Sequence, residues 1–316
     1  MKVKSFVGLG AGAAAAAGTI LIGQGYRRWR RQLLLRLLST SRLLETRQGT
    51  IEYRLEGNGP VVLFLHGSPG GYHQGVSMAQ ALDLNGFTLL SLSRPGYRRT
   101  PLSSGETPEA QADLYAATLD ALNISQVTVM AVSGGGPSAL QFARRYPQRC
   151  RGLLMLVALS QYYTEEDVYR LLSAARRLLR RLLNRLLVSD PFIYLLFNLS
   201  RRWPEEAKSS EFIESLAMNP THTPGYQNDM QQFAALKPSP LLGITLPTLI
   251  VHGTADVEVP FRQAQELAEA IPGAQLVVIE GGGHLSTLAN KKAVSAIKSF
   301  LQKLHTRQDV GITGEE

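Results

Sequence analysis

Short, unbroken apolar runs alternate with helical stretches from about residue 46 to residue 303, and this alternation limits the fold of the 316-residue chain more than any other feature. A strand that is apolar on both faces must be covered on both faces, so such runs are typical of a parallel sheet between two layers of helices. The predicted strands are 50–55 (antiparallel), 61–65, 88–92, 127–132, 152–159, 248–251 and 275–279. The predicted helices are 73–85, 108–122, 135–146, 261–271 and 288–303. The sequence therefore predicts an α/β chain with a doubly wound, mostly parallel sheet.

Residues 161–245 interrupt this alternation, because they contain no good strand candidate and several helical stretches. An insertion between two strands at the rim of a sheet is a natural lid over a site at the strand ends. We therefore predict a helical lid at 161–245 and an α/β core made of residues 45–160 and 246–304. The last residues, 305–316, are predicted to form a flexible, solvated tail.

The first helix of the predicted lid, Val168 to Leu187, has leucine pairs at helical spacing on one face and arginines on the other. An apolar run, 192–197, follows it. Two interpretations remain open: these residues pack on the core, or the lid meets a membrane or a lipid-like substrate.

Charge is concentrated in two arginine clusters, at 27–36 and 176–185, within a chain of formal net charge +8. Leucines separate the arginines in both clusters, which is typical of membrane-surface helices and not of nucleic-acid-binding arms. We therefore expect a membrane-surface partner and no nucleic acid. Cys150 is the only cysteine, which excludes an internal disulfide and favours a reducing compartment.

The N-terminal segment, 1–44, is a candidate membrane anchor followed by a basic amphipathic helix. Residues 5–25 carry no charge and would extend roughly 31 Å as a helix, about the thickness of a bilayer core. A cleaved signal peptide with export, or a leader without a membrane role, are the alternatives. The arginines that follow favour an anchor with the α/β core on the cytoplasmic side. The stretch 26–44 is interpreted as an interfacial helix, or else as a linker helix packed on the domain.

A serine stands at the turn between strand 127–132 and the next helix, in the sequence Ala131-Val132-Ser133-Gly134-Gly135. A nucleophile on a sharp strand-to-helix turn is crowded by the residues two before and two after it, so those positions must be small. Ala131 replaces the first glycine of the G-x-S-x-G pattern, and Gly135 keeps the second. A serine in a glycine-rich turn without a catalytic role is the alternative for this segment taken alone.

A hydroxyl is a weak nucleophile at neutral pH and needs a base. Of the six histidines, only His284 lies in a loop, between the last strand and the last helix, from which an imidazole could cover Ser133. An acid must orient that imidazole and fix its tautomer. Asp256 follows strand 248–251, and the order Ser, Asp, His is that of the α/β-hydrolase arrangement. The predicted catalytic residues are therefore Ser133, Asp256 and His284.

Four motifs in this order resemble the α/β-hydrolase superfamily, and the resemblance covers about residues 46–303. They are His-Gly-Ser-Pro-Gly-Gly at 66–71, Ser-Arg-Pro-Gly-Tyr at 93–97, the turn at Ser133, and the loops that hold Asp256 and His284. The resemblance implies the α/β-hydrolase fold, with the helical lid inserted after its sixth strand.

The same resemblance implies an oxyanion hole made by the backbone N–H groups of Ser68 and Gly134. It implies a structural role for His66 at the end of its strand. One departure is Arg98, which stands where similar sequences often carry a small residue.

Serine at the turn argues against the dehalogenases and epoxide hydrolases of this superfamily, which carry aspartate there. The resemblance implies a serine hydrolase that cleaves a carboxylic ester through an acyl-enzyme, with a small-molecule or lipid ester as substrate. A peptidase or amidase and a carbon–carbon bond hydrolase are alternatives on the same triad. A non-catalytic, membrane-associated binding protein is the alternative from a different class. No metal-ligand spacing and no phosphate-binding loop is present in the sequence, so neither a cofactor nor a metal is expected.

Overall fold

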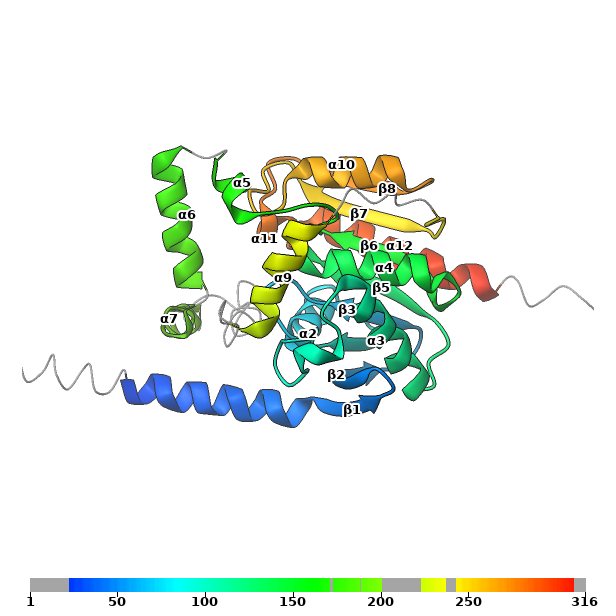
Figure 1. Ribbon diagram of the computed structural model, residues 1–316, viewed down its shortest axis with the longest axis horizontal. Helices are drawn as coiled ribbons and strands as arrows, with labels where there is room; N and C mark the ends of the chain where they lie inside the picture. Colours follow the sequence, from blue (N-terminus) through cyan, green and yellow to red (C-terminus); the bar gives the residue numbers. More distant parts are fainter. Residues whose placement is uncertain (1–22, 171–172, 188, 201–222, 237–242, 310–316) are drawn as a thin grey trace, which may run out of the picture. The chain divides into compact units, whose positions relative to one another are not determined.

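The computed structural model describes residues 23–170, 173–187, 189–200, 223–236 and 243–309. It contains an eight-stranded sheet with the strand order β1-β2-β4-β3-β5-β6-β7-β8 (Figure 1). The pairs β1–β2 and β2–β4 are antiparallel, and the remaining pairs are parallel. The strands are β1 (Arg42–Thr46), β2 (Gly49–Gly57), β3 (Val61–Leu65), β4 (Thr88–Leu92), β5 (Val127–Val132), β6 (Cys150–Leu156), β7 (Thr248–Gly253) and β8 (Gln275–Ile279). The predicted doubly wound, mostly parallel sheet is thus confirmed.

Helices cover both faces of this sheet, since alternate residues of one strand enter different apolar clusters. Leu63 and Leu65 of β3 pack with α3, α4 and α10, whereas Val62 and Phe64 pack with α2 and α12. The covering helices are α2 (Tyr72–Ala81), α3 (Pro108–Ala121), α4 (Gly136–Arg145), α10 (Phe261–Ala270) and α12 (Lys291–Asp309). Short helical turns lie at Leu102–Ser104, Ser133–Gly135, Pro147–Arg149 and in α11 (His284–Leu288).

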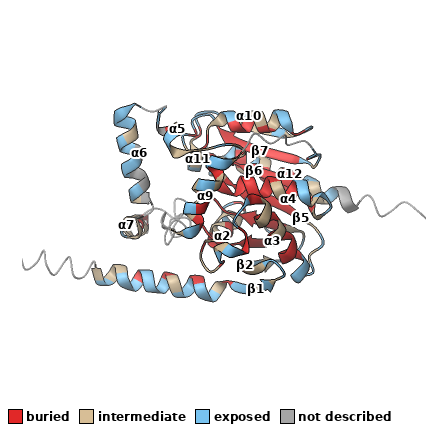
Figure 2. Ribbon diagram, viewed as in Figure 1, coloured by how far each residue is buried: buried red, intermediate tan, exposed pale blue. Residues whose placement is uncertain are grey.

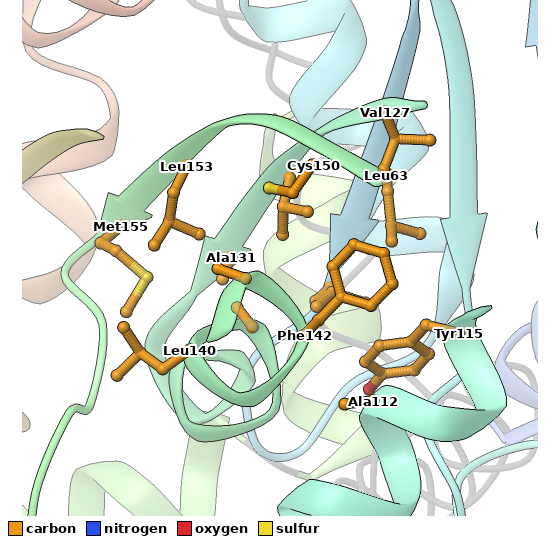
Figure 3. Close-up of a cluster of buried hydrophobic side chains, with 14 of the residues drawn as sticks. Leu63, Ala112, Tyr115, Val127, Ala131, Leu140, Phe142, Cys150, Leu153 and Met155 are labelled. Carbon is orange, nitrogen blue, oxygen red and sulfur yellow. The ribbon is translucent and has the colours of Figure 1, made fainter. Parts of the chain in front are cut away.

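All six residues of β5 are buried, as are all six of β7 (Figure 2). In the apolar cluster that contains Leu63 and Leu65, Phe142 of α4 lies beside Tyr115 of α3, with their ring centroids 6.4 Å apart (Figure 3). Cys150 belongs to the same cluster, and burial raises the pKa of its thiol to about 12. The thiol therefore stays protonated and has a packing role. Ser133, the predicted nucleophile, therefore follows a fully buried strand.

The insertion that was predicted after the sixth strand lies between β6 and β7. Its described helices are α5 (Glu165–Arg170), α6 (Ala174–Leu187), α7 (Asp190–Ser200) and α9 (Pro224–Ala235). The predicted single helix from Val168 to Leu187 is wrong, because α5 ends at Arg170 and α6 begins at Ala174. The chain divides into two compact units, Met1–Thr40 with Asn184–Met218, and Ser41–Leu183 with Asn219–Glu316.

The smaller unit contains an N-terminal helix, residues 23–40, that packs on α7. Trp29 contacts Tyr194 and Phe197, with ring centroids 5.3 and 6.0 Å apart, and Arg30 Nε lies 3.0 Å from Asp190 Oδ2. Trp29, Leu33 and Leu37, one helical stripe, are buried. This stripe is therefore on the side of the helix that packs against α7.

The end of the predicted segment 1–44 enters the sheet, because β1 begins at Arg42. This strand was not predicted, since its leucines continue the pattern of the preceding helix. Almost all of the candidate anchor, 5–25, lies outside the described residues, as does most of the predicted tail, 305–316. Among the residues that the structure describes, no helix is long and apolar enough to span a bilayer.

Candidate active site

Ser133 lies at a sharp turn between β5 and α4, with a φ of 50°. A side-chain-bearing residue rarely adopts this left-handed conformation, which costs on the order of 1–3 kcal/mol and concentrates at functional sites. The residues on both sides of Ser133 are buried, while Ser133 itself is partly exposed. The turn therefore presents the hydroxyl to the surface from a rigid base, as the sequence pattern predicts.

Three glycines follow Ser133 because the backbone approaches other backbone there. A Cβ on Gly135 would meet Leu65 O at 2.5 Å, and a Cβ on Gly136 would overlap Leu159 O. A Cβ on Gly134 would overlap Ser68 Oγ. Ala131, the departure from the glycine pattern, is fully buried and fits within the core cluster. Directly after Ser133 the structure has room only for glycine, whereas two residues before it an alanine fits.

The predicted acid and base are adjacent. His284 Nδ1 lies 2.7 Å from Asp256 Oδ2, across the loops that follow β8 and β7. With its Nδ1–H donated to the carboxylate, a neutral His284 keeps Nε2 as a proton acceptor. Because the carboxyl ends of β5, β7 and β8 lie at one edge of the parallel sheet, Ser133 is at the same edge as this pair. Within the described residues no hydrogen bond joins Ser133 Oγ to His284, so that contact stays a prediction.

A second histidine, which sequence reasoning assigned only to a strand end, also contacts the acid. His252 is fully buried, and its Nε2 lies 3.2 Å from Asp256 Oδ2 and 3.0 Å from Val259 O. The other carboxylate oxygen, Oδ1, accepts the backbone N–H groups of Glu258 at 2.8 Å and Val259 at 3.0 Å. Burial alone would raise the pKa of Asp256, but the hydrogen bonds from His252 and His284 outweigh burial and lower that pKa well below its ordinary value. Asp256 is therefore a fixed anion.

The loop after β3 lies against the nucleophile. A Cβ on Gly67 would meet Ser133 Cβ at 3.1 Å and Ser133 Oγ at 3.6 Å, and Ser68 lies beside Gly134. The structure thus brings Ser68, Gly134 and Ser133 together. We call residues 66–71 the oxyanion loop from here on.

His66, at the base of the oxyanion loop, has a structural role, as expected. Its Nε2 accepts the backbone N–H of Arg94 at 2.9 Å, and its Nδ1 donates to Gly67 O at 2.7 Å. Burial, and then the charge of Arg94, lower the pKa of His66 well below its ordinary value. A neutral imidazole with both nitrogens occupied cannot serve as a base.

An apolar wall stands beside the nucleophile. A Cβ on Gly134 would meet Phe233 Cζ at 3.0 Å, and Phe233 belongs to a cluster with Leu159 and Val259. Partly buried side chains extend this cluster: Tyr163, Met230 and Leu236. Phe233 and Met230 come from α9, so a helix of the insertion contributes to the wall. Nothing in the sequence patterns marked these residues.

The described residues contain no group of three or more His, Cys, Asp and Glu side chains arranged to hold a metal ion.

A mostly parallel sheet with a serine turn, an aspartate and a histidine at its carboxyl edge is the arrangement of an α/β hydrolase.

Comparison with known proteins agrees with this class. Residues 60–290 match the model of the alpha/beta hydrolase fold family. The chain therefore belongs to the α/β-hydrolase family, and it is a hydrolase.

The chain is 28% identical over 274 residues to the uncharacterized hydrolase YcgS of Bacillus subtilis (strain 168), a match that covers 80% of this chain and 95% of that protein. It is 26% identical over 279 residues to a 2-hydroxy-6-oxononadienedioate/2-hydroxy-6-oxononatrienedioate hydrolase of Cupriavidus pinatubonensis, covering 80% and 92% of the two chains. Among solved structures, an alpha/beta hydrolase fold protein from Nakamurella multipartita aligns with a TM-score of 0.66 and 32% identity, over 84% of this chain and 98% of that one.

Proposed function

We propose that this protein is a serine hydrolase that cleaves carboxylic esters with an apolar acyl group. The observation that carries the proposal is the left-handed, partly exposed Ser133 at the end of a fully buried strand, at the same sheet edge as the Asp256–His284 pair. In the proposed reaction, His284 Nε2 takes the proton of Ser133 Oγ as Oγ bonds to the carbonyl carbon. The backbone N–H groups of Ser68 and Gly134 stabilise the oxyanion.

Collapse of the tetrahedral intermediate breaks the bond to the leaving alcohol, which receives the proton from His284. A water then gives a proton to His284 and attacks the acyl-enzyme, and the carboxylic acid leaves as Ser133 regains its proton. Asp256 holds the Nδ1–H tautomer of His284 and stabilises the imidazolium in both halves of the reaction. Its low pKa keeps it ionised for this task.

Two features support an apolar acyl group. The wall beside Gly134 consists of Phe233, Leu159 and Val259, which offer no hydrogen bond to a polar chain. Arg94, the buried cation beside the oxyanion loop, already binds Asp229, so its charge is not offered to an anionic acyl group. The relative from Cupriavidus pinatubonensis is named as a hydrolase of a dioate. Carbon–carbon bond hydrolysis by the predicted triad of this chain is the second candidate. A peptidase or amidase is the third.

A substrate panel with Ser133→Ala as control separates these candidates. It contains p-nitrophenyl and glycerol esters of increasing chain length, aminoacyl amides and a 2-hydroxy-6-oxo-dienoate. We expect hydrolysis of the esters, with kcat/KM rising with acyl length before it levels off, and loss of that activity in Ser133→Ala. Turnover of the amides or the dienoate without the esters would replace the proposed substrate class.

We also propose that the protein works at an anionic membrane surface, and α6 supports this second function. Leu178, Leu179 and Leu182 share one side of α6 and are 71%, 55% and 53% exposed. The exposed arginines on the same helix are Arg176, Arg181 and Arg185. An exposed leucine face bordered by arginines suits the headgroup region of a bilayer, where each arginine contributes on the order of 1 kcal/mol of attraction. The cytoplasmic leaflet, which is anionic, is the proposed location, and export after cleavage of the leader is the alternative.

Sedimentation with vesicles tests the membrane proposal. Full-length protein should pellet with phosphatidylserine-containing vesicles and less with pure phosphatidylcholine, and added salt should release part of it. The double variant Leu178→Ser/Leu182→Ser should weaken pelleting, while Leu55→Ser, at an exposed leucine of β2, should not. Equal pelleting of all three proteins would exclude α6 as the contact.

A further inference from the structure

Asp229, on the buried face of α9, accepts hydrogen bonds from four donor groups. Arg94 Nη1 donates to Oδ1 at 3.0 Å and Arg94 Nη2 to Oδ2 at 2.5 Å. Tyr97 Oη donates to Oδ2 at 2.6 Å, and Ser68 Oγ donates to the same oxygen. The side chains of Arg94 and Asp229 are only 1% and 3% exposed. A carboxylate of the insertion is thus bound, away from water, to the residue that carries the predicted oxyanion donor.

Arg94 uses its remaining N–H groups on the oxyanion loop. Its Nε donates to His66 O at 2.9 Å, and Nη2 reaches Ser68 Oγ at 2.8 Å and Gly67 O at 3.4 Å. Burial opposes the charge of Arg94, but the carboxylate of Asp229 more than compensates, so the pKa of Arg94 is raised above its ordinary value. The guanidinium therefore stays charged and bridges α9 to the backbone of the loop.

The direction of one carbonyl fixes the direction of the next N–H. Gly67 O faces the guanidinium of Arg94 and accepts the Nδ1–H of His66 at 2.7 Å. In a trans peptide the C=O and the following N–H point in opposite directions. The N–H of Ser68 consequently points away from Arg94 and His66, while Gly67 lies against the side chain of Ser133.

We propose that the buried Arg94–Asp229 pair positions the oxyanion hole, so that α9 of the insertion holds the Ser68 N–H toward the reacting carbonyl. Arg94 and Asp229 are positioning residues, because neither touches the substrate in this account. α9 also carries Phe233 of the apolar wall, four residues after Asp229 on the same helical face. One helix therefore sets both the oxyanion donor and the acyl wall. The inference rests on the proposed acyl-transfer function.

A purely structural role for the pair makes a different prediction. Replacing a buried ion pair with apolar side chains of similar volume is often neutral or stabilising, whereas removing one partner leaves a buried charge. The double variant Arg94→Met/Asp229→Leu removes both charges and should keep the fold. If the pair only stabilised the fold, this variant would also keep its catalytic constants.

The positioning role predicts a loss confined to the transition state. One oxyanion donor contributes about 10²–10³ in kcat, so a donor that is present but poorly oriented should cost the double variant about 10- to 100-fold in kcat/KM. Affinity for an alkyl boronic acid, which bonds to the serine and mimics the tetrahedral intermediate, should fall in parallel. Affinity for an ether analogue of the same chain length, a ground-state ligand, should stay within about threefold.

Two single variants complete the set. Ser68→Ala keeps the backbone N–H and removes the hydroxyl that links the loop to Asp229, so its kcat/KM and boronate affinity should fall together by a smaller factor. Arg99→Gln is the matched control. Arg99 lies on the same β4–α3 connection as Arg94, and the change breaks its pair with Glu52, whose Nε–Oε1 distance is 2.7 Å, and its hydrogen bonds to Ser41. Its boronate-to-ether affinity ratio should equal that of the wild type.

Outcomes for the inference and for the proposed function are separable. A wild-type protein that neither labels with a fluorophosphonate nor hydrolyses esters contradicts the proposed function. An active wild type whose double variant is folded, labels at the wild-type rate and keeps the same affinity ratio contradicts the positioning role alone. Each rate is expressed per labelled site at the end point, so that a smaller folded fraction does not imitate a slower reaction.

Discussion

His252 connects the end of β7 to the carboxylate of Asp256, and His252→Phe tests how that carboxylate is held. Phenylalanine keeps a ring of similar size in this fully buried position, so the packing loss is small. The change removes the Nε2–H shared by Asp256 Oδ2 and Val259 O, at 3.2 and 3.0 Å. A hydrogen bond to a charged group contributes about 1.5–3 kcal/mol, and an orphaned buried carbonyl costs about 1–3 kcal/mol. Because one N–H serves both acceptors, we expect the free energy of unfolding to fall by about 2–4 kcal/mol at pH 7.

The pH dependence of stability gives the sharper test. The folded-state pKa of Asp256 is lowered, so its stabilising contribution is fully present above the unfolded pKa of about 3.9 and is lost as the pH falls toward the folded value. Removing His252 removes one of the bonds that lower this pKa. The variant should therefore lose less stability on acidification than the wild type, and the gap between the two should narrow below about pH 4 to the cost of the orphaned Val259 carbonyl.

Urea unfolding followed by far-ultraviolet circular dichroism at pH 7 and at acid pH measures both quantities. His73→Phe, at a buried histidine whose ring lies beside Tyr72 of α2, controls for the loss of an imidazole from the interior. We also expect kcat of His252→Phe to fall about tenfold, or about 1.4 kcal/mol in the barrier, because Asp256 holds His284 less firmly. An unfolding free energy equal to wild type at pH 7, with the same acid dependence, would refute this reasoning.

Three further predictions concern the rest of the site and core. Asp256→Asn should lower kcat by about 10⁴ because the amide favours the wrong tautomer of His284. His284→Ala should lower kcat as much as loss of Ser133 does. Steady-state ester hydrolysis measures both variants, and an Asp256→Asn variant with wild-type kcat would mean that another residue is the acid. Gly136→Ala should lower the melting temperature and the activity together, since its Cβ would overlap Leu159 O; calorimetry on the purified variant that shows wild-type melting would contradict this. Cys150, whose pKa burial raises to about 12, should resist iodoacetamide at pH 8 until urea unfolds the protein, as mass spectrometry would record.

Much of the fold follows from local patterns, because buried strands in a parallel sheet require unbroken apolar runs. The runs at 61–65, 88–92, 127–132 and 275–279 coincide with β3, β4, β5 and β8. β1 was not predicted because it is a short edge strand whose Leu43 is 49% exposed. Its sequence therefore lacks the unbroken apolar run of the buried strands. The break between α5 and α6 was missed because the leucine spacing continues on both sides of it.

Sequence patterns likewise predict some residues of the candidate site and not others. Ser133, Asp256 and His284 each follow a strand, and strand order alone brings them to one edge of the sheet. Asp229 carries no comparable signal, since it lies 135 residues from its partner Arg94 in the sequence and on a helix without a recognisable motif. Its role depends on which face of α9 is buried, which is a property of the assembled fold.

The structure also changes the design of one experiment. Deletion of the whole predicted N-terminal segment, 1–44, is a natural second test of membrane attachment, but it would remove Ser41, whose Oγ donates to Glu52 at 2.7 Å and accepts from Arg99 at 2.6 Å. It would also remove Arg42, Leu43 and Leu44 of β1. A truncation that ends at Thr40 leaves the sheet complete. It still removes Trp29 from its contacts with Tyr194 and Phe197 of α7, so effects on the insertion must be measured separately from effects on membrane binding.

Labelling with a fluorophosphonate probe is the most direct test of whether Ser133 is an activated nucleophile, because the probe reacts with an activated serine and not with an ordinary hydroxyl. Full-length protein and Ser133→Ala would be treated at pH 7.5, digested, and mapped by mass spectrometry. We expect one adduct per chain, on the peptide that contains Ser133, and none in the variant. A folded wild-type protein that stays unlabelled, or an adduct at another residue that persists in Ser133→Ala, would contradict it.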